Sequence, residues 1–138
     1  MANMSRTRLI ALAAAGVIVV LGLGYTWGAS GRFTIQNALD NARQELDLAE
    51  ARGVLLEAKV SLYNVNFGDA SRHFEAAKAP LRRARERYQR IGSNAAAGSI
   101  AAALEHVEEG QRLGGALDQA ANTKASDALQ AIRVATSQ

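Results

Sequence analysis

An uninterrupted apolar stretch near the N-terminus dominates the hydrophobic pattern of this chain. Residues 9–27 read LIALAAAGVIVVLGLGYTW, nineteen residues without a charged side chain. At about 1.5 Å per residue, a helix of this length covers roughly 28 Å, close to the ~30 Å hydrocarbon core of a bilayer. The pattern therefore predicts a single transmembrane helix over residues 9–27.

The flanking residues orient this helix. Arg6 and Arg8 precede it, in a short segment of residues 1–8, and Tyr25 and Trp27 close it. Basic residues favour the cytoplasmic side of a membrane, and aromatic residues favour its interfaces. We therefore expect a bacterial inner-membrane protein with a cytoplasmic N-terminus and a periplasmic, extracytoplasmic remainder. A cleavable export signal is the alternative, although the apolar run exceeds the usual ~7–15 residues of such a signal.

Small residues recur within the apolar stretch. Ala11 and Ala15 lie four positions apart, as do Gly24 and Gly28. This spacing lets another helix approach closely in lipid, although alanine and glycine are also simply common in such spans. The stretch contains no His, Asp or Glu. It therefore offers no ligand for a cofactor and no proton relay.

A regular helical pattern follows a short linker at residues 28–32. Residues recur in steps of four and three, the spacing of a long helix that packs lengthwise against a partner. The seam comprises Ile35, Leu39, Ala42, Leu46, Ala49, Gly53, Leu56, Val60, Tyr63 and Phe67. We expect it to face the core, with Leu46 and Leu56 beside Leu81 and Leu104 and a close backbone approach at Gly53.

Turn-forming residues divide the rest of the domain, residues 33–138. Gly68 and Asp69 predict the end of one helix and the cap of the next, and Gly92 predicts the next helix end. Between them runs one helix, kinked at Pro80, with a seam at Ala70, Phe74, Ala77, Leu81, Ala84, Tyr88 and Ile91. A third helix is expected over about 95–122, and a turn at 122–124 precedes a short fourth. The expected fold is all-α: an elongated antiparallel bundle of three to four helices.

Charge is distributed unevenly over this domain. Residues 69–92 carry seven basic and three acidic side chains, whereas residues 33–68 and 93–138 each carry three basic and five acidic ones. A cationic helix between two anionic neighbours suits a bundle in consecutive order. The basic run has three interpretations: neutralisation by neighbouring helices, binding of an acidic partner protein, or contact with anionic lipid headgroups. It comprises Lys78, Arg82, Arg83, Arg85, Arg87 and Arg90.

Composition narrows the possible chemistry. One proline and 5% aromatic residues favour helices over strands. The chain has no cysteine, so disulfides and thiol chemistry are excluded, and His73 and His106 lack the spacing of a metal site. No catalytic triad or phosphate-binding loop is present. We expect no enzyme activity, cofactor, nucleic acid or small-molecule substrate.

Residues 61–77 (SLYNVNFGDASRHFEAA) place Gly68 at a turn, followed by Ala70, Phe74 and Ala77 in small-large-small order. This junction resembles the helix–turn–helix of a tetratricopeptide repeat. The resemblance covers some 20 residues and lacks the Trp-Leu-Gly-Tyr signature, so it implies a shared way of packing a helical hairpin. It does not imply membership of that family.

These features predict a non-enzymatic, single-pass accessory or scaffold subunit. It would stabilise or bridge the subunits of a larger inner-membrane assembly, with a photosynthetic or respiratory electron-transport complex as the leading guess. The alternative is a periplasmic adaptor or sensor domain whose hairpin binds a soluble peptide or ligand.

Overall fold

The computed structural model describes the backbone of residues 6–138 and the side chains of residues 35–138. It divides the chain into two compact units, residues 1–41 and 42–138. The expected anchor (9–27) and linker (28–32) lie outside the residues whose side chains are described. The same holds for the residues expected to pack or anchor this helix in the membrane: Ala11, Ala15, Gly24, Gly28, Arg6, Arg8, Tyr25 and Trp27. They stay predictions. Within the described part of the chain, no helix combines the length and the apolar character of a membrane span.

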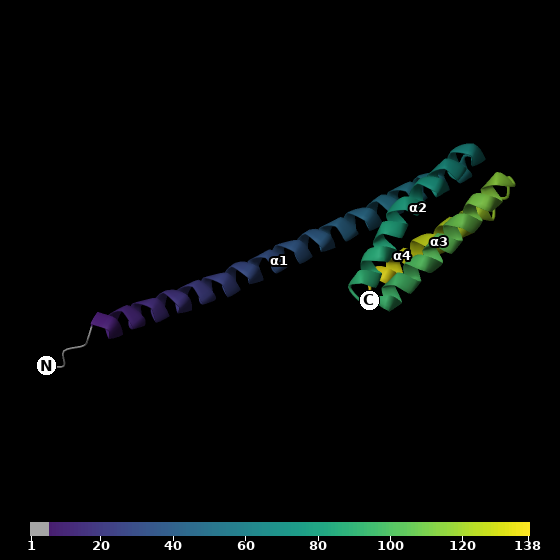
Figure 1. Ribbon diagram of the computed structural model, residues 1–138. Helices are drawn as coiled ribbons and strands as arrows, with labels where there is room; N and C mark the ends of the chain where they lie inside the picture. Colours follow the sequence, from purple (N-terminus) through teal and green to yellow (C-terminus); the bar gives the residue numbers. More distant parts are fainter. Residues whose placement is uncertain (1–5) are drawn as a thin grey trace. The chain divides into compact units, whose positions relative to one another are not determined.

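Residues 6–138 form helices joined by short turns, without a strand. The four helices are α1 (Arg6–Tyr63), α2 (Phe67–Arg90), α3 (Asn94–Gly115) and α4 (Ala121–Thr136), shown in Figure 1. In the unit of residues 42–138, α2 packs on α3 and α3 packs on α4. Side chains of α1 bond to both α2 and α4, for example Glu50 to Arg83 and Lys59 to Ser126. The expected all-α bundle is confirmed, with four helices.

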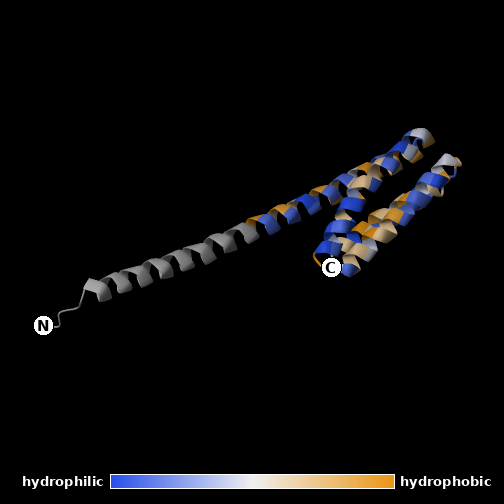
Figure 2. Cartoon of the chain, in the orientation of Figure 1, coloured by the Kyte–Doolittle hydropathy of each residue, from blue (hydrophilic) through white to orange (hydrophobic). Residues whose placement is uncertain are grey.

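The core of the bundle is narrow and rich in alanine. In Figure 2 hydrophobic and hydrophilic segments alternate along its helices, because each helix turns one face inward. Phe74 is the largest of the fully buried side chains, accompanied by Leu55, Leu62, Leu81 and Ile100. Small residues between these large ones let the helix backbones approach closely.

The prediction of which face of α1 is buried is wrong. The buried residues of this helix, here called the inner seam, are Leu48, Ala51, Leu55, Ala58 and Leu62. They also recur in steps of three and four, but two positions further along the chain, a rotation of about 200° around the helix axis. Leu46 and Leu56, which were expected beside Leu81 and Leu104, are therefore exposed. The seam of α2 is confirmed from Ala70 to Ala84, whereas Tyr88 is half-buried and Ile91 is exposed.

The turn between α1 and α2 lies earlier than expected. Val65 adopts a left-handed conformation (φ +58°), and Asn66 is the N-cap, its Oδ1 accepting a hydrogen bond from the Asp69 backbone N–H at 3.2 Å. Gly68 and Asp69 therefore lie inside α2. An asparagine at the N-cap satisfies a backbone N–H that the first helical turn cannot. The expected helix end at Gly92 is confirmed, with φ +77°.

Pro80 does not divide α2, which runs through it as one helix, as expected. The third helix, however, ends at Gly115, and the turn expected at residues 122–124 occupies residues 116–120 instead. Leu117 adopts φ +59° there, and the Asp118 side chain accepts a hydrogen bond from the Ala120 backbone N–H at 2.8 Å. Residues 122–124 lie inside α4.

One glycine marks the tightest packing between helices. A Cβ atom on Gly110 would lie 2.7 Å from Cε1 of Phe74 and 3.3 Å from Cβ of Lys124. The ring of Phe74 thus fills the space beside the α3 backbone. Gly53, where close approach was expected, has no atom within 4 Å of the corresponding position, so that expectation is wrong.

Candidate functional site

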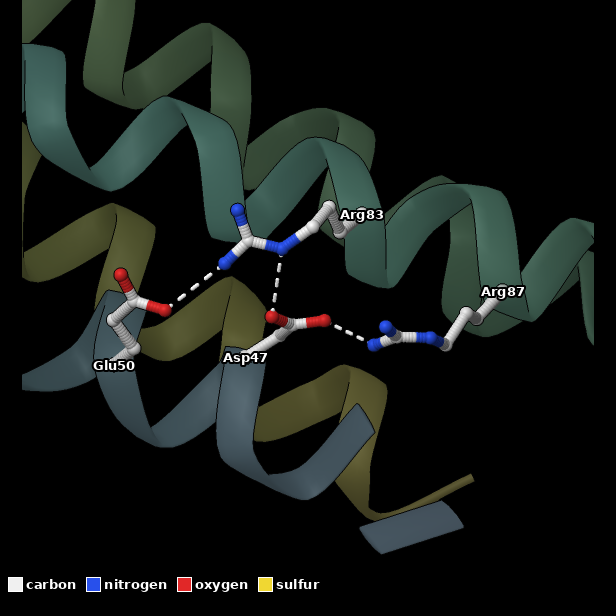
Figure 3. A network of polar contacts seen from close by, with 4 residues as sticks. All are labelled: Asp47, Glu50, Arg83 and Arg87. Carbon is white, nitrogen blue, oxygen red and sulfur yellow. Dashed lines mark hydrogen bonds and ion pairs between the residues drawn. The ribbon is translucent and has the colours of Figure 1, made fainter. Parts of the chain in front are cut away.

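The basic run of α2 is the first candidate surface, and part of it points into the bundle. Figure 3 shows Asp47 of α1 between two arginines of α2. Arg83 Nε donates to Asp47 Oδ1 at 2.8 Å, and Arg87 Nη1 donates to Asp47 Oδ2. A second Arg83 nitrogen donates to Glu50 at 2.9 Å. These bonds tie α2 to α1, so Arg83 and Arg87 serve the fold.

Asp47 is nearly inaccessible, with 6% of the residue exposed. A buried carboxylate is costly unless ionised donors surround it, and the two guanidinium groups provide this. The hydrogen bond to Asp47 is also the main cause that raises the pKa of Arg83. The network therefore explains why an anionic α1 lies beside a cationic α2.

Lys78 is also used within the bundle. Its Nζ lies 2.6 Å from Glu75 Oε2, and it also bonds to Gln111 of α3. The hydrogen bond from Lys78, with a second from Gln111, lowers the pKa of the Glu75 carboxyl group. Three of the six basic residues thus have polar partners on neighbouring turns or helices.

The other three basic residues behave differently. Arg82 and Arg90 are exposed, and neither forms a direct ion pair with a carboxylate in residues 35–138. Arg85 is half-buried, and its Nε is buried without a hydrogen-bond partner in that part of the chain. The basic run is therefore not one surface. Only Arg82 and Arg90 are freely available to a partner.

The second candidate surface is the seam that was expected in the core. Its exposed apolar residues include Leu46, Leu56 and Val60, with 68%, 54% and 61% of the residue accessible. We call it the outer seam, within the unit of residues 42–138: Ala42, Leu46, Ala49, Gly53, Leu56, Val60 and Tyr63. Sequence reasoning found these residues but assigned them to the wrong side of the helix.

Two borders of different charge run beside the second half of the outer seam. On the α4 side, Arg52 donates to Thr136 at 3.1 Å and Lys59 donates to Ser126 at 2.8 Å. On the α2 side, Glu50 bonds to Arg83, and Glu57 lies 3.3 Å from His73 Nδ1. The seam thus has a basic border facing α4 and an acidic border facing α2.

A shallow groove opens where the basic border meets α4. It has a volume of about 410 Å³ and is lined by Arg52, Leu56, Leu129 and Arg133. Neither arginine forms an ion pair with a carboxylate in residues 35–138. A groove with apolar walls and two cations suits a ligand that carries both apolar and anionic groups.

The two histidines do not assemble a metal site. His73 faces Glu57, and in the described part of the chain no group of three or more His, Cys, Asp or Glu side chains could hold a metal ion. No protein-family model matches the chain, and searches of curated proteins and of solved structures give no significant match.

Proposed function

We propose that the chain is a non-enzymatic, single-pass accessory subunit that stabilises or bridges a larger inner-membrane assembly. Residues 9–27 anchor it, its N-terminus is cytoplasmic, and its helical domain is extracytoplasmic. A photosynthetic or respiratory electron-transport complex is one candidate host. The observation that carries the proposal is the outer seam of α1, an exposed apolar row on a small domain.

The exposed apolar row favours an interaction protein over a free monomer. Large apolar patches that face water on small soluble domains usually mark sites of association. A thin, alanine-rich bundle also buries little apolar surface for its size, so contacts with other subunits add to its stability. The small residues Ala11, Ala15, Gly24 and Gly28 provide a second contact face within the bilayer.

Co-purification tests this proposal. The tagged full chain, extracted from its native membrane in mild detergent, is expected to elute with other subunits in fixed stoichiometry. Ala11→Leu with Ala15→Leu should weaken this association and leave membrane insertion intact. A chain that elutes free of other proteins, with this variant indistinguishable from the wild type, would contradict the proposal.

A charge reversal at Arg82 and Arg90 tests whether the exposed basic residues contribute. Arg82→Glu with Arg90→Glu should lower the yield of co-purified subunits without changing the thermal unfolding midpoint. The matched control is Arg83→Glu with Arg87→Glu, which has the same charge change but breaks the bonds to Asp47 and should lower that midpoint. An unchanged yield for the first variant would exclude Arg82 and Arg90 from the partner site.

The second candidate is a periplasmic adaptor or sensor that binds a soluble peptide or ligand. The groove lined by Arg52, Leu56, Leu129 and Arg133 favours it. An acidic peptide with apolar side chains should then bind the full chain, and Arg133→Ala should weaken this binding. Absence of measurable binding by calorimetry to a panel of such peptides would count against this alternative.

A further inference from the structure

We propose that the outer seam of α1 is a self-association surface, on which a second copy of this chain packs in parallel and in register. The spacing is the first support. From Ala42 to Tyr63 the outer seam alternates steps of four and three without interruption, and its large residues are exposed. This is the repeat by which two helices interlock along their length.

The order of residues along the seam suits a parallel pair. In such a pair each seam residue meets its own copy, so Gly53 meets Gly53 and Ala49 meets Ala49. No atom of the bundle lies within 4 Å of a Cβ built on Gly53, so the partner backbone can come close there. The positions that flank this narrow region are Leu46 and Leu56. Val60 occupies the a position of the heptad and Leu56 the d position. A β-branched residue at a with leucine at d favours a coiled coil of two helices.

The borders of the outer seam make it complementary to itself. In a parallel pair, the α4-side border of one copy lies against the α2-side border of the other. Arg52 of one copy then faces Glu57 of the other, five residues further along the chain, and Lys59 faces the uncharged Asn64. In an antiparallel pair each border would face the same border of the second copy, so that like charges would meet. A single surface that carries both complementary charges fits a second copy of the same chain.

One pairing is unfavourable and is already compensated. Glu45 of one copy would face Glu50 of the other, but Glu50 bonds to Arg83 within its own bundle at 2.9 Å. The anchor adds a further constraint, because two copies inserted in one membrane with the same orientation can pair only in parallel. That step rests on the proposed function, whereas the spacing and the charged borders do not.

Cross-linking at single cysteines tests the proposal, because the native chain has none. Val60→Cys and Leu46→Cys are made separately in the full chain in its membrane and treated with a short thiol-to-thiol cross-linker. Both are expected to give covalent dimers. Glu105→Cys, at an exposed position of α3, is the matched control and should stay monomeric.

The two positions separate parallel from antiparallel pairing. They lie fourteen residues apart, about 21 Å along a helix. In an antiparallel pair, a register that places Val60 beside Val60 of the second copy therefore separates the two Leu46 residues by about 42 Å. A register that places Leu46 beside Leu46 separates the two Val60 residues by the same distance. Cross-linking at only one position, at neither, or equally in the control would overturn the proposal. Because this readout requires no other protein, it is independent of whether a host assembly co-purifies.

A charge exchange tests the register. Glu57→Lys should reduce the cross-linked fraction of the Val60→Cys chain, because Arg52 of the second copy then faces a cation. Adding Arg52→Glu to the same chain restores opposite charges and should restore the dimer. A double variant that cross-links no better than Glu57→Lys alone would overturn the proposed register.

Discussion

Helix α1 carries two apolar rows of the same spacing, and only one of them is buried in the bundle. The inner seam places leucines at Leu48, Leu55 and Leu62, separated by Ala51 and Ala58. The outer seam also offers Leu46 and Leu56, together with Val60 and Tyr63, yet it faces solvent. Heptad spacing therefore identifies a helix that packs lengthwise but not the face that its own domain covers.

A polar residue beside the inner seam distinguishes the two rows. Asp47 precedes Leu48 and bonds to Arg83 and Arg87 of α2. A carboxylate held by two guanidinium groups fixes which side of α1 lies against the cationic helix. Beside the outer seam, Arg52 and Lys59 lie on the α4 side and Glu50 and Glu57 on the α2 side, and the proposed pairing of two copies rests on this charge pattern.

Truncation of one leucine on each seam gives the largest expected contrast. Leu55→Ala removes a fully buried side chain and should reduce the free energy of unfolding by ~2–5 kcal/mol. Leu56→Ala removes an exposed neighbour and should change it by less than about 0.5 kcal/mol in the monomer. Thermal unfolding of the full chain in mild detergent, at a concentration where it is monomeric, measures both. Equal losses would mean that the two faces are not distinct.

Alanine substitution at two glycines, one packed and one open, gives a smaller contrast in the free energy of unfolding. Gly110→Ala pushes a methyl group against the Phe74 ring, at a separation that forces the ring or the backbone to move. Overpacking of this kind costs about 1–3 kcal/mol. Gly53→Ala adds its methyl group to open space and should stabilise the helix by about 0.5–1 kcal/mol. The same unfolding measurement is expected to give shifts of opposite sign, and a shared sign would show that Gly53 is not on an open face.

The sequence predicted the number and order of the helices better than the way they pack against one another. Helix α2 could be assigned because the row from Ala70 to Ala84 is its only long apolar row, so spacing alone identifies the buried face. Helix α1 has two such rows, and the choice between them depends on Asp47, whose arginine partners are 36 and 40 residues away. Contacts between distant residues of this kind do not appear in local periodicity.

The turns and the basic run show the same limit. Asn66 and Asp118 stabilise their turns through side-chain hydrogen bonds to backbone N–H groups, whereas Gly68, from which the first turn was predicted, lies inside α2. Within the basic run, charge alone could not separate Arg83 and Arg87, which bond to α1, from Arg82 and Arg90, which are exposed. That distinction required knowing which turns of α2 face α1.

The polar edge of the inner seam gives the last of the expected effects. Asp47→Ala leaves Arg83 and Arg87 without their shared carboxylate, which should reduce the free energy of unfolding by about 1–2 kcal/mol. The loss is below that of a fully buried ion pair, because 46% of the Arg83 side chain is exposed and can be hydrated, and Glu50 still holds it. Glu45→Ala, at an exposed position two residues away, is the control and should have almost no effect. If both variants unfold at the wild-type midpoint, the network does not select the buried face of α1, and apolar packing of the inner seam must do so alone.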